Sequence, residues 1–174
     1  MRVIAGTARG RRLTAPAGIS VRPTSDRVRE SIFNRLESLN MIRGATMLDL
    51  FAGSGALGIE ALSRGAASAV FVDHDATAVR AVKANLESLD FEARVHRMTA
   101  TRFFTTMDAR FDVALLDPPY DFSEWHQLLE MLPADAAVIE SASPVDLPAG
   151  WIEIKASSYG RTQVAVVERT QAVP

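Results

Sequence analysis

From Thr46 onward, short apolar segments alternate with segments of helical length, and this alternation is the strongest constraint on the fold. Val113–Leu116 is apolar at every position, which is typical of a strand buried on both faces of a parallel sheet. Trp151–Lys155 and Gln163–Val167 flank a turn at Tyr159–Gly160, as in an antiparallel hairpin. The pattern predicts an α/β, doubly wound, mostly parallel sheet with an antiparallel C-terminal hairpin. The other predicted strands are Arg2–Ala5, Met47–Leu50, Ala69–Val72, Ala93–His96 and Ala137–Glu140, and the helices after Thr46 are Ala56–Arg64, Thr77–Leu89, Thr101–Met107 and Ser123–Leu132.

Length and composition fit one soluble domain. The 174 residues can bury one hydrophobic core, and 48% apolar with 23% charged residues is an ordinary globular composition. No apolar run approaches the roughly 20 residues that cross a bilayer, and the N-terminus lacks an apolar export signal. The chain has no cysteine, and its three histidines show no metal-ligand spacing. We expect a cytoplasmic protein without a metal site, in which residues 1–174 form a single domain.

Basic residues are concentrated at the N-terminus. Residues 1–43 contain nine arginines and three acidic residues, a net charge of +6, whereas the remainder carries −8. Such segregation indicates a phosphate-binding surface, although a solvated arginine-rich face would look the same. Within this segment, Thr24–Asp26 predicts a helix start, and Val28, Ile32 and Leu36 recur at helical spacing. We therefore divide the domain into a basic arm and helix, 1–43, and an α/β core, 44–174.

A glycine-rich turn follows the predicted strand Met47–Leu50. Gly53, Gly55 and Gly58 satisfy G-x-G-x-x-G, which brings backbone close to a ligand in dinucleotide-binding folds. Asp49 stands four residues before the first glycine, where a carboxylate would repel a pyrophosphate but suits a ligand with an ammonium and a sulfonium. An ordinary tight turn between strand and helix is the simpler alternative.

Asp73 ends the next predicted strand. An acidic residue at this position can accept both hydroxyls of a ribose, which supports an adenosine ligand of either the nicotinamide or the S-adenosylmethionine (AdoMet) type. Asp75 is better explained as the N-cap of the following helix. Together, Asp49, Gly53, Gly55 and Asp73 predict a cofactor site at the carboxyl edge of the sheet.

The sequence Asp117-Pro118-Pro119-Tyr120 directly follows the apolar strand Val113–Leu116. The exocyclic amine of a base is a poor nucleophile, and two fixed acceptors at its hydrogens stabilise the charge that develops during attack. The Asp117 carboxylate and the Pro118 carbonyl can serve as these acceptors, and Pro119 restricts the conformation of Pro118. Tyr120 offers a flat face on which a base can stack. The alternative is a strand terminator with a packing tyrosine.

These motifs resemble the bacterial 16S rRNA (guanine-N2)-methyltransferases, a family of small class I AdoMet-dependent enzymes. The resemblance runs nearly end to end and is most particular at Arg22–Glu30. The matching segments are Arg2–Gly6, Gly10–Arg12, Arg22–Glu30, Phe33-Asn34, Asp49–Gly58, Phe71–Asp73, Asn85-Leu86, Asp117–Tyr120 and Tyr159–Thr162. Thr99 departs from the polar amide or acid that relatives often carry near the cofactor adenine.

The resemblance implies a Rossmann-like class I methyltransferase fold with AdoMet as donor and the N2 amine of one guanine in 16S rRNA as acceptor. The substrate would be naked RNA or a small-subunit assembly intermediate, and a monomer is compatible with the sequence. The implied cofactor residues are Asp49, Phe51, Gly53, Gly55, Asp73 and Asp117, and the catalytic ones are Asp117, Pro118, Pro119 and Tyr120. The expected RNA contacts are Tyr120 and six arginines, Arg9, Arg11, Arg12, Arg22, Arg27 and Arg29.

Three other functions remain open at this point. An adenine-N6 methyltransferase acting on DNA or RNA would use the same Asp-Pro-Pro-Tyr loop, and only the Arg22–Glu30 resemblance favours guanine. A nicotinamide-dependent oxidoreductase would use the glycine loop, but Asp49 and the Asp117 loop argue against it. A catalytically inactive RNA-binding module would not need both loops.

Overall fold

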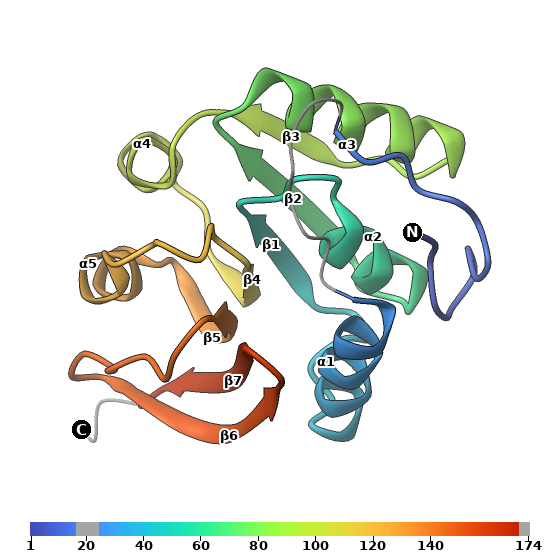
Figure 1. The fold of residues 1–174 in the computed structure, drawn as a ribbon. Coiled ribbons are helices and arrows are strands. Elements are labelled where there is room, and N and C mark those ends of the chain that lie inside the picture. The colour runs from blue at the N-terminus through green and yellow to red at the C-terminus, as the bar shows by residue number, and fades with distance from the viewer. Residues whose placement is uncertain (17–24, 171–174) are drawn as a thin grey trace.

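The computed structural model describes residues 1–16 and 25–170 and consists of one sheet between two layers of helices (Figure 1). The seven-stranded sheet has the order β3-β2-β1-β4-β5-β7-β6. Its strands are β1 (Thr46–Leu50), β2 (Ser68–Asp73), β3 (Arg94–Arg97), β4 (Phe111–Leu116), β5 (Ala134–Ser141), β6 (Trp151–Tyr159) and β7 (Thr162–Arg169). The helices are α1 (Asp26–Ser38), α2 (Ala56–Ser63), α3 (Ala76–Ser88), α4 (Ala100–Thr106) and α5 (Trp125–Met131).

Strand pairing confirms the predicted fold class. Strands β3, β2, β1, β4 and β5 are parallel, and β7 pairs antiparallel with both β5 and β6. Parallel neighbours require crossover connections, and the helices between these strands supply them. The strand order reverses between β1 and β4, which is where ligands bind in open α/β sheets.

Apolar side chains form a separate core on each face of the sheet. One core joins Met47, Phe71 and Leu115 of the sheet to buried residues of α1, α2 and α3. The other joins Leu50 and Leu116 to buried residues of α4 and α5. Because side chains alternate along a strand, β1, β2, β4, β5 and β7 each contribute to both cores, which explains the continuous apolar runs in the sequence.

Side-chain caps fix the starts of three helices. Ser25 accepts the backbone N–H of Val28 at the start of α1, and Thr99 accepts that of Arg102 at the start of α4. Asp75 accepts the N–H groups of Thr77 and Ala78, which confirms it as the N-cap of α3. Each bond satisfies a donor that has no partner within its helix. Within residues 1–16 and 25–170, none of the helices combines the length and hydropathy that a bilayer crossing requires.

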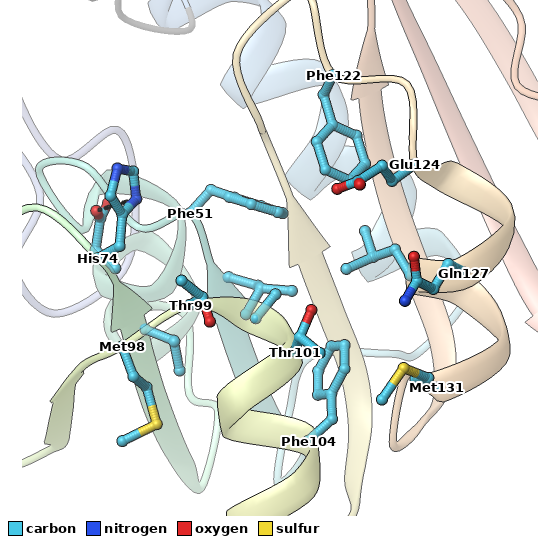
Figure 2. Close-up of a pocket in the computed structure, with 15 residues that line it drawn as sticks. Phe51, His74, Met98, Thr99, Thr101, Phe104, Phe122, Glu124, Gln127 and Met131 are labelled. Atoms are coloured by element: carbon cyan, nitrogen blue, oxygen red, sulfur yellow. Dashed lines mark ion pairs between the residues drawn. The ribbon is translucent and has the colours of Figure 1, made fainter.

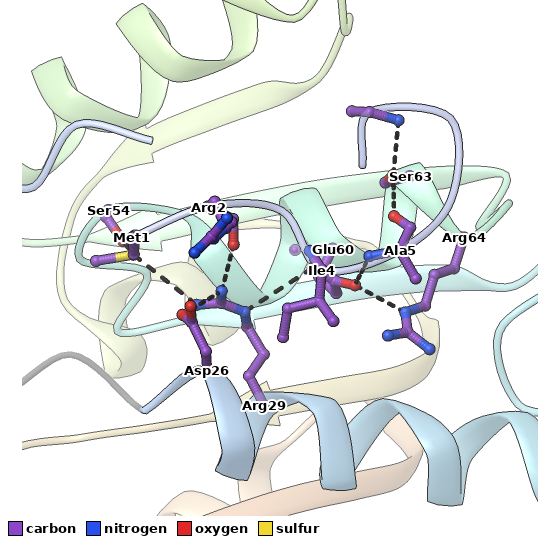
Figure 3. A network of polar contacts seen from close by, with 12 residues as sticks. Met1, Arg2, Ile4, Ala5, Asp26, Arg29, Ser54, Glu60, Ser63 and Arg64 are labelled. Carbon is purple, nitrogen blue, oxygen red and sulfur yellow. Dashed lines mark hydrogen bonds and ion pairs between the residues drawn. The ribbon is translucent and has the colours of Figure 1, made fainter. Parts of the chain in front are cut away.

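The N-terminal segment is held by a buried carboxylate instead of joining the sheet. Glu60 on α2 accepts the backbone N–H groups of Ile4 (2.8 Å) and Ala5 (3.0 Å) and forms an ion pair with Arg64 at 2.8 Å (Figure 3). The expected strand Arg2–Ala5 is therefore wrong, and the segment forms only one bridge, between Arg2 and Arg12. Two of its N–H groups bind Glu60 in place of a neighbouring strand.

The same network corrects the role expected for Arg29. Its side chain is fully buried (0% exposed), pairs with Asp26 at 3.0 Å and lies 3.8 Å from Glu60. Arg29 also donates to the carbonyl of Arg2 (Figure 3). A guanidinium enclosed in this way is not accessible to RNA. To reach RNA it would have to leave its buried partners, which would then be unpaired in the protein interior. Arg29 instead joins α1 to the N-terminal segment and α2.

We predict that Glu60→Ala lowers the free energy of unfolding by about 3–5 kcal/mol, since it removes a buried carboxylate that Arg29 and Arg64 share and leaves two backbone N–H groups of the N-terminal segment without their acceptor. Glu37→Ala is the matched control. Glu37 also pairs with Arg64, at 3.2 Å, but its side chain is 52% exposed, so its loss should cost below ~1 kcal/mol. Urea unfolding of both variants measures the difference. Equal losses would show that the buried network contributes no more than a surface ion pair.

Candidate functional site

Four acidic residues lie on one face of the sheet at its carboxyl edge. Asp49 pairs in register with Phe71 of β2 and Leu115 of β4. Asp73 ends β2 and Asp117 follows β4, each two residues beyond these partners, and Glu140 is the second-last residue of β5. Side-chain alternation therefore puts all four on the face that packs against α1, α2 and α3. The topology gathers residues 49, 73, 117 and 140 into one row.

Asp49 is the most deeply buried member of this row. One carboxylate oxygen accepts the backbone N–H of Gly58 at 2.8 Å. Burial raises the pKa of Asp49 well above its usual value, and the nearby charges of Asp117 and Asp73 raise it further, against the lowering effect of the Gly58 bond. Burial alone would disfavour any charge, but the part of the shift that comes from Asp117 and Asp73 reflects a negative potential that favours a cationic ligand. Asp49 also fixes the start of α2.

The three glycines of the loop differ in what surrounds an added side chain. A Cβ at Gly58 would lie 2.4 Å from the Phe71 ring, and one at Gly55 would lie 3.3 Å from Phe71 and Val82. Both positions are required for packing of α2, so their substitution would disturb the fold as well as any ligand. At Gly53, where φ is +56°, the nearest atom to an added Cβ is the Phe51 carbonyl oxygen at 4.0 Å. The loop therefore opens onto free space at Gly53.

Asp73 links the glycine loop to the end of β2. Its carboxylate accepts the N–H groups of Gly53 (2.8 Å) and Asp75 (2.9 Å). Each carboxylate oxygen has two lone-pair sites, so these bonds leave capacity for further donors. The side chain borders a hollow at this edge of the sheet.

This hollow lies between the loop after β1 and the helices α4 and α5 (Figure 2). It encloses about 640 Å³ of empty space, part of it open to solvent, which is within the range of small-molecule sites. Phe51 borders it in a left-handed backbone conformation, with φ of 65°, and its ring packs against Phe122 at 5.4 Å. Non-glycine residues in this conformation are concentrated at functional sites. The polar lining includes Asp73, His74, Thr99, Thr101, Glu124 and Gln127, and the apolar lining includes Met98, Phe104, Phe122 and Met131.

The Asp117–Tyr120 loop leaves the carboxyl end of β4 next to the glycine loop. Pro118 is buried, whereas Pro119 and Tyr120 are exposed, with 51% of Tyr120 accessible. The Tyr120 hydroxyl lies 3.0 Å from the Thr162 hydroxyl at the start of β7. This hydrogen bond holds the ring in place while leaving its surface accessible. The terminal hairpin thus supports the tyrosine of the loop.

The remaining arginines expected at RNA differ in their environments. Arg9, Arg12 and Arg27 are exposed. Arg11 is exposed as well, but its guanidinium donates to the carbonyl of Ser88 at the end of α3. Arg22 lies outside the described residues.

Sequence and structure comparisons place this arrangement among known proteins. The family model "Conserved hypothetical protein 95" matches residues 1–168. "Putative rRNA methyltransferase YlbH" of Bacillus subtilis is 41% identical over 97% of this chain and 99% of its own. The chain belongs to the Conserved hypothetical protein 95 family. "Ribosomal RNA small subunit methyltransferase D" of Escherichia coli is 38% identical over 87% of this chain and 81% of its own. The solved structure of yhhF from Escherichia coli has a TM-score of 0.86 at 34% identity and covers 97% of both chains.

These relatives confirm the family predicted from the sequence motifs. Their names contain the word methyltransferase, but neither curated name specifies which base is modified. In this member of the Conserved hypothetical protein 95 family, Phe51 and Asp73 line the hollow among the cofactor residues expected from the sequence, and its helical side was not predicted. Met98, Phe104, Phe122, Gln127 and Met131 line the hollow from α4, α5 and their preceding loops. Their spacing in the sequence is that of ordinary core residues, so it carried no signal.

We predict that Asp49→Asn stabilises the ligand-free protein at neutral pH. Asparagine keeps an acceptor for the Gly58 N–H but removes the buried charge. The pKa of Asp49 is raised in the folded state, so folding favours its protonated form. The contribution of Asp49 to the free energy of unfolding is therefore complete below the unfolded pKa of about 3.9 and is lost as pH rises through the folded pKa. The advantage of Asp49→Asn should therefore shrink as pH falls to ~4. Thermal unfolding between acidic and neutral pH measures this dependence.

Asp146→Asn is the control, since the side chain of Asp146 is 96% exposed. It should leave the melting temperature and its pH dependence close to those of the wild type. An Asp49→Asn protein that melts below the wild type at neutral pH would contradict the assignment of a buried, destabilising charge.

Proposed function

We propose that this protein is an AdoMet-dependent methyltransferase that modifies the N2 amine of a guanine in 16S rRNA. The observation that carries the proposal is the Asp117–Tyr120 loop, which leaves β4 beside a glycine loop at the switch point of the sheet. Curated relatives named as rRNA methyltransferases support both the reaction and the class of substrate. The guanine acceptor rests on the resemblance at Arg22–Glu30.

AdoMet fits the chemistry of the residues around the hollow. Asp73 has acceptor capacity for ribose hydroxyls at the end of β2, and the open space at Gly53 allows a ligand to approach the backbone. The hollow beside Phe51 has both apolar and polar walls, as an adenine ring requires. Besides burial, the charges of Asp117 and Asp73 raise the pKa of Asp49, and this acidic row suits a ligand with a sulfonium and an ammonium. When bound, AdoMet supplies an activated methyl group on its sulfonium.

The acceptor base would lie against Tyr120. The ring is exposed and fixed through its hydroxyl by Thr162, so one face is available for stacking, which is worth about 1–3 kcal/mol for one base. The base must leave its own stack to reach this position. The Asp117 carboxylate and the Pro118 carbonyl then accept the amine hydrogens, which favours a pyramidal nitrogen and stabilises its developing positive charge. A carboxylate there can also take the proton that the methylated amine releases.

The basic arm provides the surface for the RNA backbone. Arg9, Arg12 and Arg27 are exposed, and Arg11 is exposed although bonded to Ser88. We retain these four and Arg22 as proposed phosphate contacts and leave out the buried Arg29. Neutralisation of phosphates by arginine releases counterions, so binding through this surface should weaken as salt increases.

The function is tested by nucleoside mass spectrometry. The protein is incubated with AdoMet and either naked 16S rRNA, assembling small subunits or duplex DNA, and each product is digested to nucleosides. The proposal expects N2-methylguanosine in one of the RNA samples. N6-methyladenine in RNA or DNA would support the alternative use of the same loop and overturn the guanine assignment.

We predict that Gly53→Ala lowers AdoMet affinity at least tenfold, because the new methyl group enters the space where the ligand approaches. Gly150→Ala is the matched control. Gly150 also has a positive φ, +89°, with open space around it, and it directly precedes β6. Each substitution carries the backbone cost of a left-handed alanine, about 1–2 kcal/mol. Calorimetric titration with AdoMet measures affinity, and equal affinity in the two variants would exclude Gly53 from the site.

We predict that Asp117→Ala slows methyl transfer by about 10²–10³-fold, the usual effect of removing one preorganised electrostatic partner. AdoMet affinity should change much less, because Gly53 and Asp73 are untouched. Single-turnover rates at saturating RNA isolate the chemical step. If Asp117 has only a structural role, the melting temperature falls and activity declines only in proportion to the unfolded fraction.

A further inference from the structure

Guanine and adenine differ at the ring nitrogen next to the reactive amine. In guanine, N1 carries a hydrogen and is a donor beside the N2 amine. In adenine, N1 is an acceptor beside the N6 amine. A site for guanine N2 therefore needs one acceptor more than Asp117 and Pro118 supply, whereas a site for adenine N6 needs a donor at that position. A side chain next to Asp117 on the neighbouring strand can supply the group at this position.

Glu140 occupies this neighbouring position. Strands β4 and β5 are parallel and pair Leu116 with Ile139, so residues 117 and 140 follow at the same level of the sheet. Adjacent strands lie roughly 4.8 Å apart. Val138 and Leu115 contribute to the same core, so alternation puts Glu140 and Asp117 on the same face. The two carboxylates stand side by side at the carboxyl edge.

The terminal hairpin connects Glu140 to the tyrosine on which the base would stack. Glu140 pairs in register with Val164 of β7, and Thr162, two residues earlier on the same strand, holds the Tyr120 hydroxyl at 3.0 Å. Val138, Val164 and Val166 belong to the same core. The strand pair β5–β7 thus fixes the position of Glu140 relative to the stacking surface.

The burial of Glu140 is unusual for its residue type. It is 5% exposed, at the end of a strand whose preceding residues Val138 and Ile139 are apolar. A carboxylate is costly to bury unless it is paired or hydrogen-bonded. Asp117 and Glu140 both have interaction partners in the ligand-free protein. A bound base would therefore exchange existing interactions for new ones.

We propose that Glu140 determines the choice of base by accepting the N1–H of guanine while Asp117 accepts the N2 amine. This assignment rests on the proposed function and deepens it. With adenine in the same pose, the Glu140 carboxylate would face the N1 lone pair. Neither group has a hydrogen to share, so the base is rejected by repulsion and by the loss of its hydrogen bond.

The test uses 2-aminopurine, which keeps the reactive amine next to an N1 acceptor. Mass spectrometry first locates the modified nucleotide, and RNA is then ligated with guanine or 2-aminopurine at that position. We measure kcat/KM for both RNAs with the wild type, Glu140→Gln and Glu153→Gln. Glu153, exposed on β6, serves as the control. RNA with inosine, which lacks the amine, gives the background.

The wild type should prefer guanine by at least ~10²-fold, because a site built around a hydrogen bond strongly rejects an analogue that cannot make it. Glu140→Gln should reduce this ratio at least tenfold, since its amide can present either an oxygen to N1–H or an N–H to N1. Glu153→Gln should keep the wild-type ratio. Loss of the guanine O6 contributes equally to every variant, so the change in the ratio isolates N1.

Three results would overturn the assignment. If the wild type methylates both RNAs equally, the site does not distinguish the protonation of N1. This comparison needs no variant. If Glu140→Gln leaves the ratio unchanged, even with a lower melting temperature and slower reaction on both RNAs, Glu140 has only a structural role. If Glu140→Gln does not fold, Glu140→Asp is measured instead. It retains the charge, so a Glu140→Asp protein without a preference for guanine is the third such result. In all of these results N2-methylguanosine still forms on natural RNA, whereas failure of the proposed function leaves none.

Discussion

The parallel register of β2, β1, β4 and β5 is the constraint on which the site depends. Because parallel strands end at the same edge, residues that are far apart in the sequence come together there with their side chains on one face. Here that rule aligns Asp73, Asp49, Asp117 and Glu140. Burial raises the pKa of Asp49, and the nearby charges of Asp117 and Asp73 raise it further, so ionised carboxylates in this row oppose folding. The sheet tolerates the row because the apolar cores on its two faces supply the stability.

The acidic residues have different surroundings at the two ends of this edge, which allows one edge to bind a cofactor and an acceptor base. Toward β2, the acids are combined with backbone donors, since Asp73 binds the N–H groups of Gly53 and Asp75. Toward β5, Glu140 and the loop with Asp117 adjoin the hairpin, where Thr162 holds Tyr120. The β2 side thus suits a cation with hydroxyl groups, and the β5 side suits a flat ring with N–H donors. Methyl transfer requires these two regions to meet, and they do so around Asp49 and Asp117.

The features that depend on the order of elements along the chain could be predicted from the sequence. Those that depend on how the helices and side chains pack could not. The strands, the two loops and their common edge follow from apolar runs, glycines and the topology rules for α/β folds. The helical wall of the hollow did not, because Phe104 and Met131 have the same spacing whether they fill a core or border a cavity. Arg29 was misplaced for a related reason. Arg29 is buried beside Glu60, the one charged residue of helix α2, and that isolated charge was the available signal.

The basic arm and the glycine loop are joined by buried polar contacts. Asn85 on α3 is buried and accepts the Thr14 N–H at 2.8 Å, while its amide donates to the carbonyls of Thr14 and Ser54, both at 2.9 Å. Ser54 lies between the loop glycines, and Glu60 on the following helix binds the arm at Ile4 and Ala5. Detaching the arm would leave the Asn85 amide and the Glu60 carboxylate without these partners, at the desolvation cost of buried polar groups. Thr14 and the arginines that precede it are therefore held in a fixed relation to the glycine loop.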